Sequence, residues 1–139
     1  MSFFTATRKT QFSESDAAGI IHFSQVAIYI EEVEHFFFQQ EGYPIRLNEP
    51  DTYHWPRVYF EASYLHPILP LVEIQISLKP SRVGTTSITW DWVVKGEERD
   101  DPLASGKMKT ICCKCHNGFV APSTLPEPLK KKLTAGMTV

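Results

Sequence analysis

The sequence predicts an α+β domain in which one long helix packs against an antiparallel sheet of about five strands. Three observations carry this prediction. The chain has 139 residues, of which 42% are hydrophobic, and this size fits a single domain, residues 1–139. Residues 24–41 carry apolar side chains at helical spacing, whereas one segment before them and four after them alternate like strands. Consecutive strands without intervening helices are typical of an antiparallel sheet.

The first strand is predicted at residues 3–13, where aromatic and β-branched side chains such as Phe3, Thr5 and Thr7 recur at alternate positions. The polar cluster from Ser13 to Asp16 follows, and its composition indicates a turn.

The segment 24–41 is predicted to be helical because apolar residues recur every three to four positions. Ser24 is a candidate N-cap and Gly42 a candidate stop after the last turn. Further apolar residues widen the buried arc, so other elements should cover most of this helix. Its narrower solvent-exposed side is predicted to comprise Glu31, Glu32, Glu34 and His35.

Four successive strands are predicted after a loop at residues 43–56 that contains Pro and Asp. Their approximate spans are 57–66, 70–80, 85–96 and 103–116. A short terminal helix is predicted from Pro126 to Leu133. A sheet with one helix leaves one face uncovered, so that face is either polar or covered by another subunit. Apolar residues on both faces of the later strands favour a covering subunit.

Composition narrows the classes of function. The net charge of −2 argues against a nucleic-acid-binding surface, which is basic overall. The N-terminus lacks a basic segment followed by an apolar one, and no apolar run approaches the ~20 residues that cross a bilayer. The three cysteines, crowded into residues 112–115, suit a reducing compartment. We therefore expect a cytoplasmic protein without membrane or nucleic-acid partners.

The most specific motif lies at residues 12–23, which read Phe-Ser-Glu-Ser-Asp-Ala-Ala-Gly-Ile-Ile-His-Phe. This segment resembles the signature of the 4-hydroxybenzoyl-CoA-thioesterase-like family, which has an acid, any residue, Asp, two small residues, Gly, two aliphatic residues and an aromatic before a helix. In this resemblance Asp16 matches the catalytic Asp and Gly19 the turn glycine. Phe23 matches the residue whose N–H polarises the thioester carbonyl. Glu14 stands where the family commonly has Asp, and it retains the charge.

The resemblance extends over nearly the whole chain, since the helix and the segments 56–64 and 84–90 also look like the family's pattern. It implies a hotdog fold, in which a curved antiparallel sheet wraps a long central helix. It also implies an acyl-CoA thioester hydrolase that needs no cofactor, because coenzyme A is part of the substrate. The expected assembly is a homodimer whose sheets join edge to edge, commonly paired into a homotetramer, with active sites at the subunit interface.

The chemistry of the segment agrees with this resemblance. Thioester hydrolysis needs a nucleophile or general base at the carbonyl carbon and donors aimed at its oxygen. Asp16 precedes a helix whose first N–H groups, near Phe23 and Ser24, lack intrahelical partners and form a positive pole. Gly19 allows the chain to turn closely enough for the Asp16 carboxylate and these N–H groups to meet around one substrate atom. An Asx-type turn or a helix-end charge is the alternative role of Asp16. Analogy favours nucleophilic attack over general-base catalysis, and the sequence leaves both open.

Other polar residues have both structural and functional interpretations. His22 is a candidate proton donor to the departing thiolate or a structural wall of the pocket. Glu31 or Glu32 is an alternative to Asp16, because related thioesterases carry a Glu on the central helix. The cluster from Cys112 to His116 lacks the spacing of a zinc site, so buried strand thiols and no metal are expected. Candidate cations for the coenzyme A phosphates are Arg82, Lys79 and Arg57, which lie near strand ends.

Two alternatives to a thioesterase stay open. One is a hotdog hydratase or dehydratase acting on acyl thioesters, which would pair a His with an acid; here only His22 is close to Asp16 in sequence. The other is a non-catalytic acyl-CoA-binding module, which would need a partner domain for its output. The identity of the acyl group, aromatic or aliphatic, is also open, because core packing explains the aromatic residues of the helix as well as a pocket does.

Overall fold

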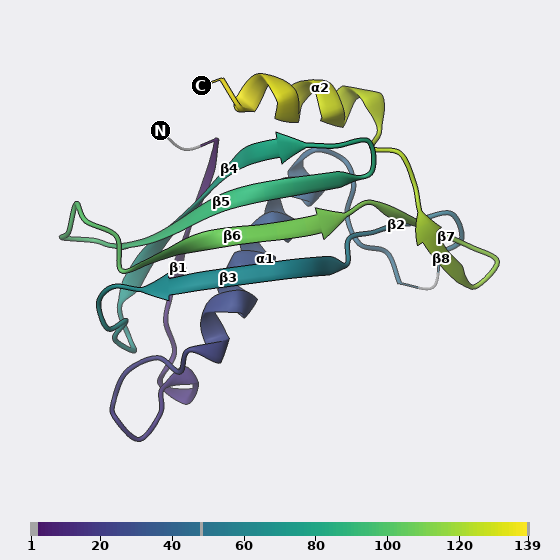
Figure 1. Ribbon diagram of the computed structural model, residues 1–139. Helices are drawn as coiled ribbons and strands as arrows, with labels where there is room; N and C mark the ends of the chain where they lie inside the picture. The colour runs from purple at the N-terminus through teal and green to yellow at the C-terminus, as the bar shows by residue number, and fades with distance from the viewer. Residues whose placement is uncertain (1–2, 48, 139) are drawn as a thin grey trace.

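A computed structural model describes residues 3–47 and 49–138. Five strands form one antiparallel sheet in the order β1-β4-β5-β6-β3, and helix α1 lies across one face (Figure 1). The elements of this unit are β1 Phe4–Lys9, α1 Ser24–Gln40, β3 Arg57–Tyr64, β4 Glu73–Val83, β5 Ser87–Gly96 and β6 Ala104–Ile111. The α+β class and the five-stranded antiparallel sheet are confirmed, with a helix of 17 residues.

The core lies between α1 and the sheet face that it covers. Alternate residues of β4 and β5, such as Ile76, Leu78 and Trp90, are fully buried, as the period of two predicts. Residues of α1 at helical spacing, such as Ile30 and Phe37, meet them from the other side. Each fully buried aliphatic side chain contributes about 1.5–3 kcal/mol, so this interface fixes the position of the helix on the sheet.

The ends of α1 match the prediction at one end and differ at the other. After the C-cap residue Glu41, Gly42 has φ 93°, the left-handed conformation that stops a helix. At the start, Ser24 is already the first helical residue and Phe23 is the N-cap, without a side-chain hydrogen bond. The predicted N-cap role of Ser24 is therefore wrong by one residue.

Glu34 corrects the predicted solvent side of the helix, because its side chain is 0% exposed. Its carboxylate accepts hydrogen bonds from the Arg57 guanidinium at 2.6 and 2.9 Å, from Thr110 Oγ1 at 2.7 Å and from Trp90 Nε1. The largest influence on this carboxyl is burial, which raises the pKa of Glu34 despite these partners. Glu34 therefore ties α1 to three strands of the sheet, and Glu31 is the more exposed glutamate beside it.

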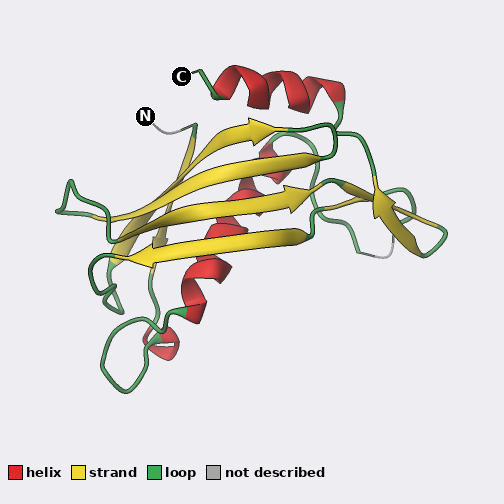
Figure 2. Ribbon diagram, viewed as in Figure 1, coloured by secondary structure: helices red, strands yellow, loops and turns green. Residues whose placement is uncertain are grey.

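The expected strand at residues 103–116 is divided in two. β6 ends at Ile111, and after Cys112 the chain enters β7 Cys113–His116, which belongs to a separate three-stranded sheet (Figure 2). The other strands of this small sheet are β2 Tyr53–His54, within the predicted loop, and β8 Phe119–Pro122. Asn117 and Gly118 have φ 50° and 81°, the values of a two-residue hairpin turn, and they join β7 to β8.

The terminal helix α2, Glu127–Gly136, begins where it was predicted and extends further. It packs on β4 through buried Leu129 and Leu133. The sheet face opposite α1 is mostly polar: Lys107 pairs with Asp91 there at 2.5 Å. The expectation of apolar residues on both faces is therefore wrong, and this face does not need a covering subunit to satisfy the hydrophobic effect.

Candidate active site

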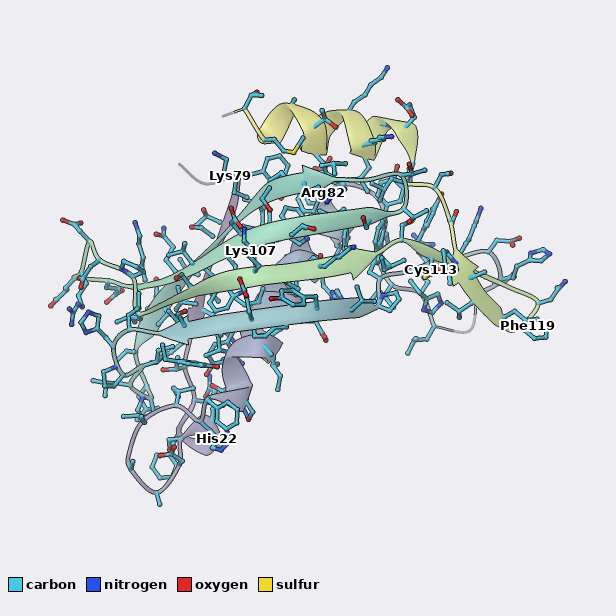
Figure 3. The ribbon with its side chains drawn as sticks, viewed as in Figure 1. His22, Lys79, Arg82, Lys107, Cys113 and Phe119 are labelled. Atoms are coloured by element: carbon cyan, nitrogen blue, oxygen red, sulfur yellow. The ribbon has the colours of Figure 1, made fainter. Side chains whose placement is uncertain are left out.

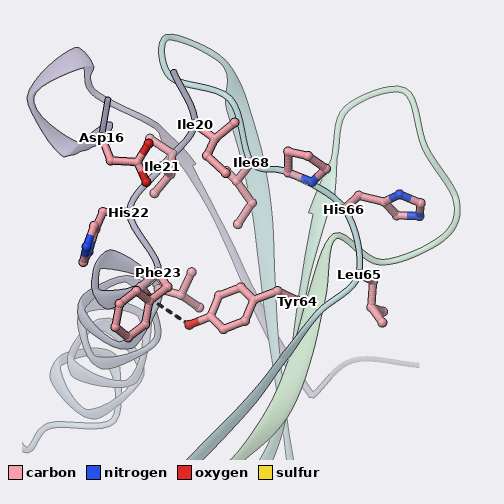
Figure 4. Close-up of a pocket in the computed structure, with 11 residues that line it drawn as sticks. Asp16, Ile20, Ile21, His22, Phe23, Tyr64, Leu65, His66 and Ile68 are labelled. Atoms are coloured by element: carbon pink, nitrogen blue, oxygen red, sulfur yellow. Dashed lines mark hydrogen bonds between the residues drawn. The ribbon is translucent and has the colours of Figure 1, made fainter. Parts of the chain in front are cut away.

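A cavity of about 420 Å³ lies at the start of α1, between the segment that carries the sequence motif and the segment that follows β3 (Figure 4). Its lining is mainly apolar, with one carboxylate and two imidazoles. The residues around it are Asp16, Ile20, Ile21, His22, Phe23, Val26, Tyr64, Leu65, His66, Pro67 and Ile68. An apolar cavity with few convergent polar groups is the usual form of a small-molecule site.

Asp16 sits in a tight turn that the predicted glycine makes possible. The N–H of Asp16 donates to the carbonyl of Ile20 at 2.9 Å, and the N–H of Gly19 donates to the carbonyl of Asp16 at 3.0 Å. Gly19 has φ 79°, a conformation that costs other residues about 1 kcal/mol or more. Asp16 Oδ1 accepts the N–H of Ala18 at 2.8 Å, whereas Oδ2 accepts no hydrogen bond from the described residues. Asp16 therefore forms an Asx turn through Oδ1 and also lines the cavity.

The backbone of Phe23 provides a donor at the same cavity. Within residues 3–47 and 49–138, the N–H of Phe23 has no hydrogen-bond acceptor, while the N–H of Gln25 donates to the carbonyl of His22 at 3.0 Å. The N-terminus of a helix carries a partial positive charge of roughly half an electron, which attracts an anion or a polarised oxygen. The Phe23 side chain is 66% exposed, so its backbone, not its ring, is the part held in place.

His22 binds the start of the helix. Its Nδ1 lies 2.8 Å from Ser24 Oγ and accepts the N–H of Ser24 at 3.3 Å, and its ring contacts that of Phe23. The N–H of His22 donates to the carbonyl of Glu14 at 2.9 Å. These contacts are structural, yet the imidazole also lines the cavity, so both sequence-based interpretations of His22 stay open.

A partly buried ionic network holds the motif segment on the fold. The Arg8 guanidinium, on β1, donates two hydrogen bonds to the Glu14 carboxylate at 2.7 and 3.0 Å and one to Glu32 Oε2 at 2.9 Å. The Tyr29 hydroxyl donates to Glu14 Oε1 at 2.8 Å. Burial is the largest single influence and opposes ionisation of Glu14, but the hydrogen bonds from Arg8, the Gln11 N–H and Tyr29, with the charge of Arg8, together outweigh it, so the pKa of Glu14 is lowered. This anchoring explains why an acid stands two residues before Asp16.

The wall of the cavity opposite the motif is the segment after β3, residues 65–68, and it is hydrogen-bonded to the motif segment directly and, through the residues that follow it, to the end of β1. The N–H of Ile21 donates to the carbonyl of Ile68 at 2.7 Å. Thr10, which is fully buried, donates through Oγ1 to the carbonyl of Leu69 at 2.6 Å and through its N–H to that of Val72 at 2.8 Å. Leu71 donates its N–H back to the carbonyl of Thr10 at 2.9 Å. The two sides of the cavity therefore share one hydrogen-bonded frame.

The structure brings Asp16, Gly19, His22 and Phe23 together, but it does not bring the three candidate phosphate ligands to this cavity. Lys79 and Arg82 lie on β4, at the opposite end of the molecule from His22 in Figure 3. Arg57 is bound to Glu34 and is 3.7 Å from Glu31. The alternative acids are also elsewhere: Glu32 binds Arg8, and neither it nor Glu31 lines the cavity.

The described part of the chain contains neither a cluster of metal-binding side chains nor a helix that could span a membrane. Between residues 3 and 138, residue 48 excepted, no three His, Cys, Asp or Glu side chains are grouped to hold a metal ion. Cys112 and Cys113 are buried, and burial raises the pKa of the Cys112 thiol to about 12, so it stays protonated. No helix in this part of the chain has both the length and the apolar character that crossing a membrane requires.

Sequence reasoning missed two residues of the cavity, Tyr64 and His66. The Tyr64 hydroxyl donates to the carbonyl of Phe23 at 2.8 Å, across 41 positions of sequence. His66 Nε2 lies 2.9 Å from Asp101 Oδ2, and Asp101 is also bound by Arg99. The signal for Tyr64 was its place at the end of the segment 56–64, which already resembled the family.

Known proteins resemble this chain in sequence and in fold. No family model matches the chain. A protein of Aquifex aeolicus (strain VF5) that is provisionally named an esterase is 26% identical over 129 residues, which are 91% of this chain and 98% of that protein.

Several solved structures share the fold. A 1,4-dihydroxy-2-naphthoyl-CoA thioesterase of Synechocystis superposes with a TM-score of 0.76 at 19% identity, over 94% of this chain and 95% of that one. A gentisyl-coenzyme A thioesterase superposes with a TM-score of 0.78 at 19% identity, over 91% and 98%. A PAO1-strain protein of Pseudomonas aeruginosa reaches a TM-score of 0.85 at 15% identity, over 97% and 92%. The chain thus has the fold of these thioesterase structures, the hotdog fold that its motif implied.

Proposed function

We propose that the protein is an acyl-CoA thioester hydrolase in which Asp16 acts on the thioester carbonyl carbon and the N–H of Phe23 polarises its oxygen. One observation carries the proposal. A carboxylate with an unoccupied oxygen and a helix-terminal N–H without an acceptor, among the described residues, lie on the same apolar cavity. These are the two groups that acyl transfer from a thioester requires.

Two routes use the same groups. As a nucleophile, the Asp16 carboxylate attacks the carbonyl carbon, the C–S bond breaks to release the coenzyme A thiolate, and water hydrolyses the resulting anhydride. As a general base, Asp16 takes a proton from the water that attacks. Both routes give a free acid and coenzyme A, and both develop negative charge on the carbonyl oxygen. A donor such as the Phe23 N–H stabilises that charge by about 3 kcal/mol.

Coenzyme A binding rests on the cations of β4 in this proposal. Arg82 is exposed and Lys79 lies on the same strand. Because both lie far from the cavity of their own chain, they stay proposed phosphate ligands only for a coenzyme A bound at the site of a second copy. Arg57 is a weaker candidate, because moving its guanidinium to a phosphate would leave the Glu34 carboxylate buried without its ionic partner.

The test of the activity is a panel of acyl-CoA esters assayed by release of the free thiol. The panel contains benzoyl, dihydroxynaphthoyl and straight-chain esters, since two proteins of the same fold are named for aromatic acyl groups. We expect at least one ester to be hydrolysed with kcat/KM of roughly 10⁴ M⁻¹s⁻¹ or more, the lower end for natural enzymes. Failure to hydrolyse any ester above the rate in buffer would count against the proposal.

The proposed assembly is a homodimer joined at the β3 edge. In the described chain β3 pairs with β6 alone, which leaves one row of its backbone groups unpaired. Val58 and Tyr59 on this strand are 58% and 51% exposed. A second copy could satisfy these groups, and pairing of dimers into a homotetramer stays an expectation of the resemblance.

Light scattering during gel filtration tests the dimer. We expect the protein to elute at about twice its chain mass of 15.9 kDa, or at a multiple of that. Val58→Asp places a charge at the apolar edge and should raise the dissociation constant by about 10²-fold, which corresponds to ~2.7 kcal/mol. The matched control is Thr7→Asp on β1, the opposite edge strand, which should leave the mass unchanged. A stable monomer of the parent protein at micromolar concentration would refute this assembly.

A further inference from the structure

We infer that Tyr64 is a positioning residue that presents the Phe23 N–H to the substrate carbonyl, an inference that rests on the proposed function. Tyr64 is the last residue of β3, and its side chain points to Phe23 at the start of α1 (Figure 4). Its hydroxyl donates to the carbonyl of Phe23 at 2.8 Å. It is therefore the link between the sheet and the residue that carries the proposed donor.

The contacts of Phe23 show why such a link is needed. Its side chain is mostly exposed and its ring contacts only that of His22 among the aromatic side chains described. The first intrahelical bond to its carbonyl, from the N–H of Val26, is long at 3.4 Å. The bond from Tyr64 is much shorter, so the hydroxyl is the stronger restraint on the backbone of Phe23.

The restraint acts on direction as well as on position. The Phe23 carbonyl and the Phe23 N–H belong to adjacent planar peptide groups that are joined only by the φ and ψ torsions of this residue, which are −56° and −30°. A restraint on the carbonyl therefore also limits the directions that the N–H can take. A donor contributes to catalysis only while it points at the place where the oxyanion forms, and a misplacement of about 1 Å costs on the order of 10²-fold in rate. Tyr64 itself has its proton committed to Phe23, and burial raises its pKa, so it stays a donor at neutral pH.

Tyr64→Phe tests the inference, because it removes one oxygen and keeps the ring against the cavity. We expect kcat to fall by about 10-fold or more, with KM changed by less than about twofold, since the affected donor acts mainly in the transition state. The matched control is Tyr43→Phe, which also removes one tyrosine hydroxyl. Tyr43 follows the C-terminal end of α1, packs against Tyr53 and does not line the cavity. The control should keep the parent kcat.

A second substrate separates positioning from proton donation. A residue that protonates the departing thiolate becomes unimportant when the leaving thiol is acidic, as in a thiophenyl ester of the same acid. A residue that aims the oxyanion donor stays equally important. We therefore expect Tyr64→Phe to show the same fold loss of kcat on the thiophenyl and the coenzyme A esters.

Three results would overturn the inference while leaving the proposed function intact. They are a parent-like kcat of Tyr64→Phe in an active parent enzyme, an equal loss in Tyr43→Phe, and a loss that vanishes with the thiophenyl ester. Inactivity of the parent protein on every thioester would instead refute the proposed function itself. Thermal unfolding midpoints of the two Tyr variants, measured alongside, should shift by similar amounts.

Discussion

Asp16→Asn is expected to lower kcat by about 10²-fold or more with little change in KM. The substitution removes the negative charge that both nucleophilic attack and general-base catalysis require. It leaves the local structure in place, because the amide oxygen of Asn can accept the N–H of Ala18 as Asp16 Oδ1 does at 2.8 Å. Steady-state kinetics on the best acyl-CoA ester, with circular dichroism to verify the fold, measures the effect.

The controls for this prediction are Glu31→Gln and Glu32→Gln on α1. Neither residue lines the cavity, and Gln at position 32 can still bind Arg8, so each variant should retain most of the parent kcat. A reversed pattern, in which Asp16→Asn is nearly as active as the parent and a helix glutamate variant is inactive, would move the catalytic carboxylate to the helix.

Arg57→Met is expected to destabilise the fold by about 3–5 kcal/mol. The substitution leaves Glu34, which is 0% exposed, without the guanidinium that binds it at 2.6 Å. An uncompensated buried charge is among the most costly defects in a protein, whereas the pair itself is worth little compared with an apolar replacement. Equilibrium unfolding in urea at pH 7 measures the loss.

The pH dependence of this loss has a definite sign. Burial raises the pKa of Glu34, and loss of Arg57, which acts in the opposite direction, would raise it further. In the window between the ordinary pKa and the raised one, the folded state binds more protons than the unfolded state, so stability falls as pH rises. Arg57→Met should therefore be more destabilised at pH 8 than at pH 5.

Two further variants check the cause. Arg99→Met removes an exposed ion pair with Asp101 and should change stability by less than about 1 kcal/mol. Glu34→Gln combined with Arg57→Met removes the unpaired charge and should recover a large part of the loss. Equal destabilisation of the double variant and of Arg57→Met at both pH values would show that the charge of Glu34 is not the cause.

The sequence predicted those features that depend on local periodicity. The spacing of apolar residues at 24–41 is that of α1, and alternation in β4 and β5 matches their buried positions. The turn at Asp16 followed from a glycine that needs a positive φ. In each case the physical signal lies within a few neighbouring residues, so a single sequence contains it.

The features that were missed depend on partners far apart in the chain. Glu34 looks like a solvent-exposed residue until Arg57, Trp90 and Thr110 are placed around it. Tyr64 acquires its role only when β3 ends beside the start of α1. The Asn-Gly pair at 117–118 was a local signal for the β7–β8 hairpin, whereas the break at Cys112 that divides the last long strand depends on β7 pairing with β2 and β8.

The buried Thr10 has a consequence for how the cavity moves. Its N–H, carbonyl and hydroxyl all bond to residues 69–72, so the wall of the cavity and the end of β1 can open only together. Because β1 is paired along its length with β4, such an opening would approach unfolding of the sheet. The exposed turn after Asp16 has no comparable ties, so fluctuations that admit or release a ligand belong to that turn and not to the opposite wall.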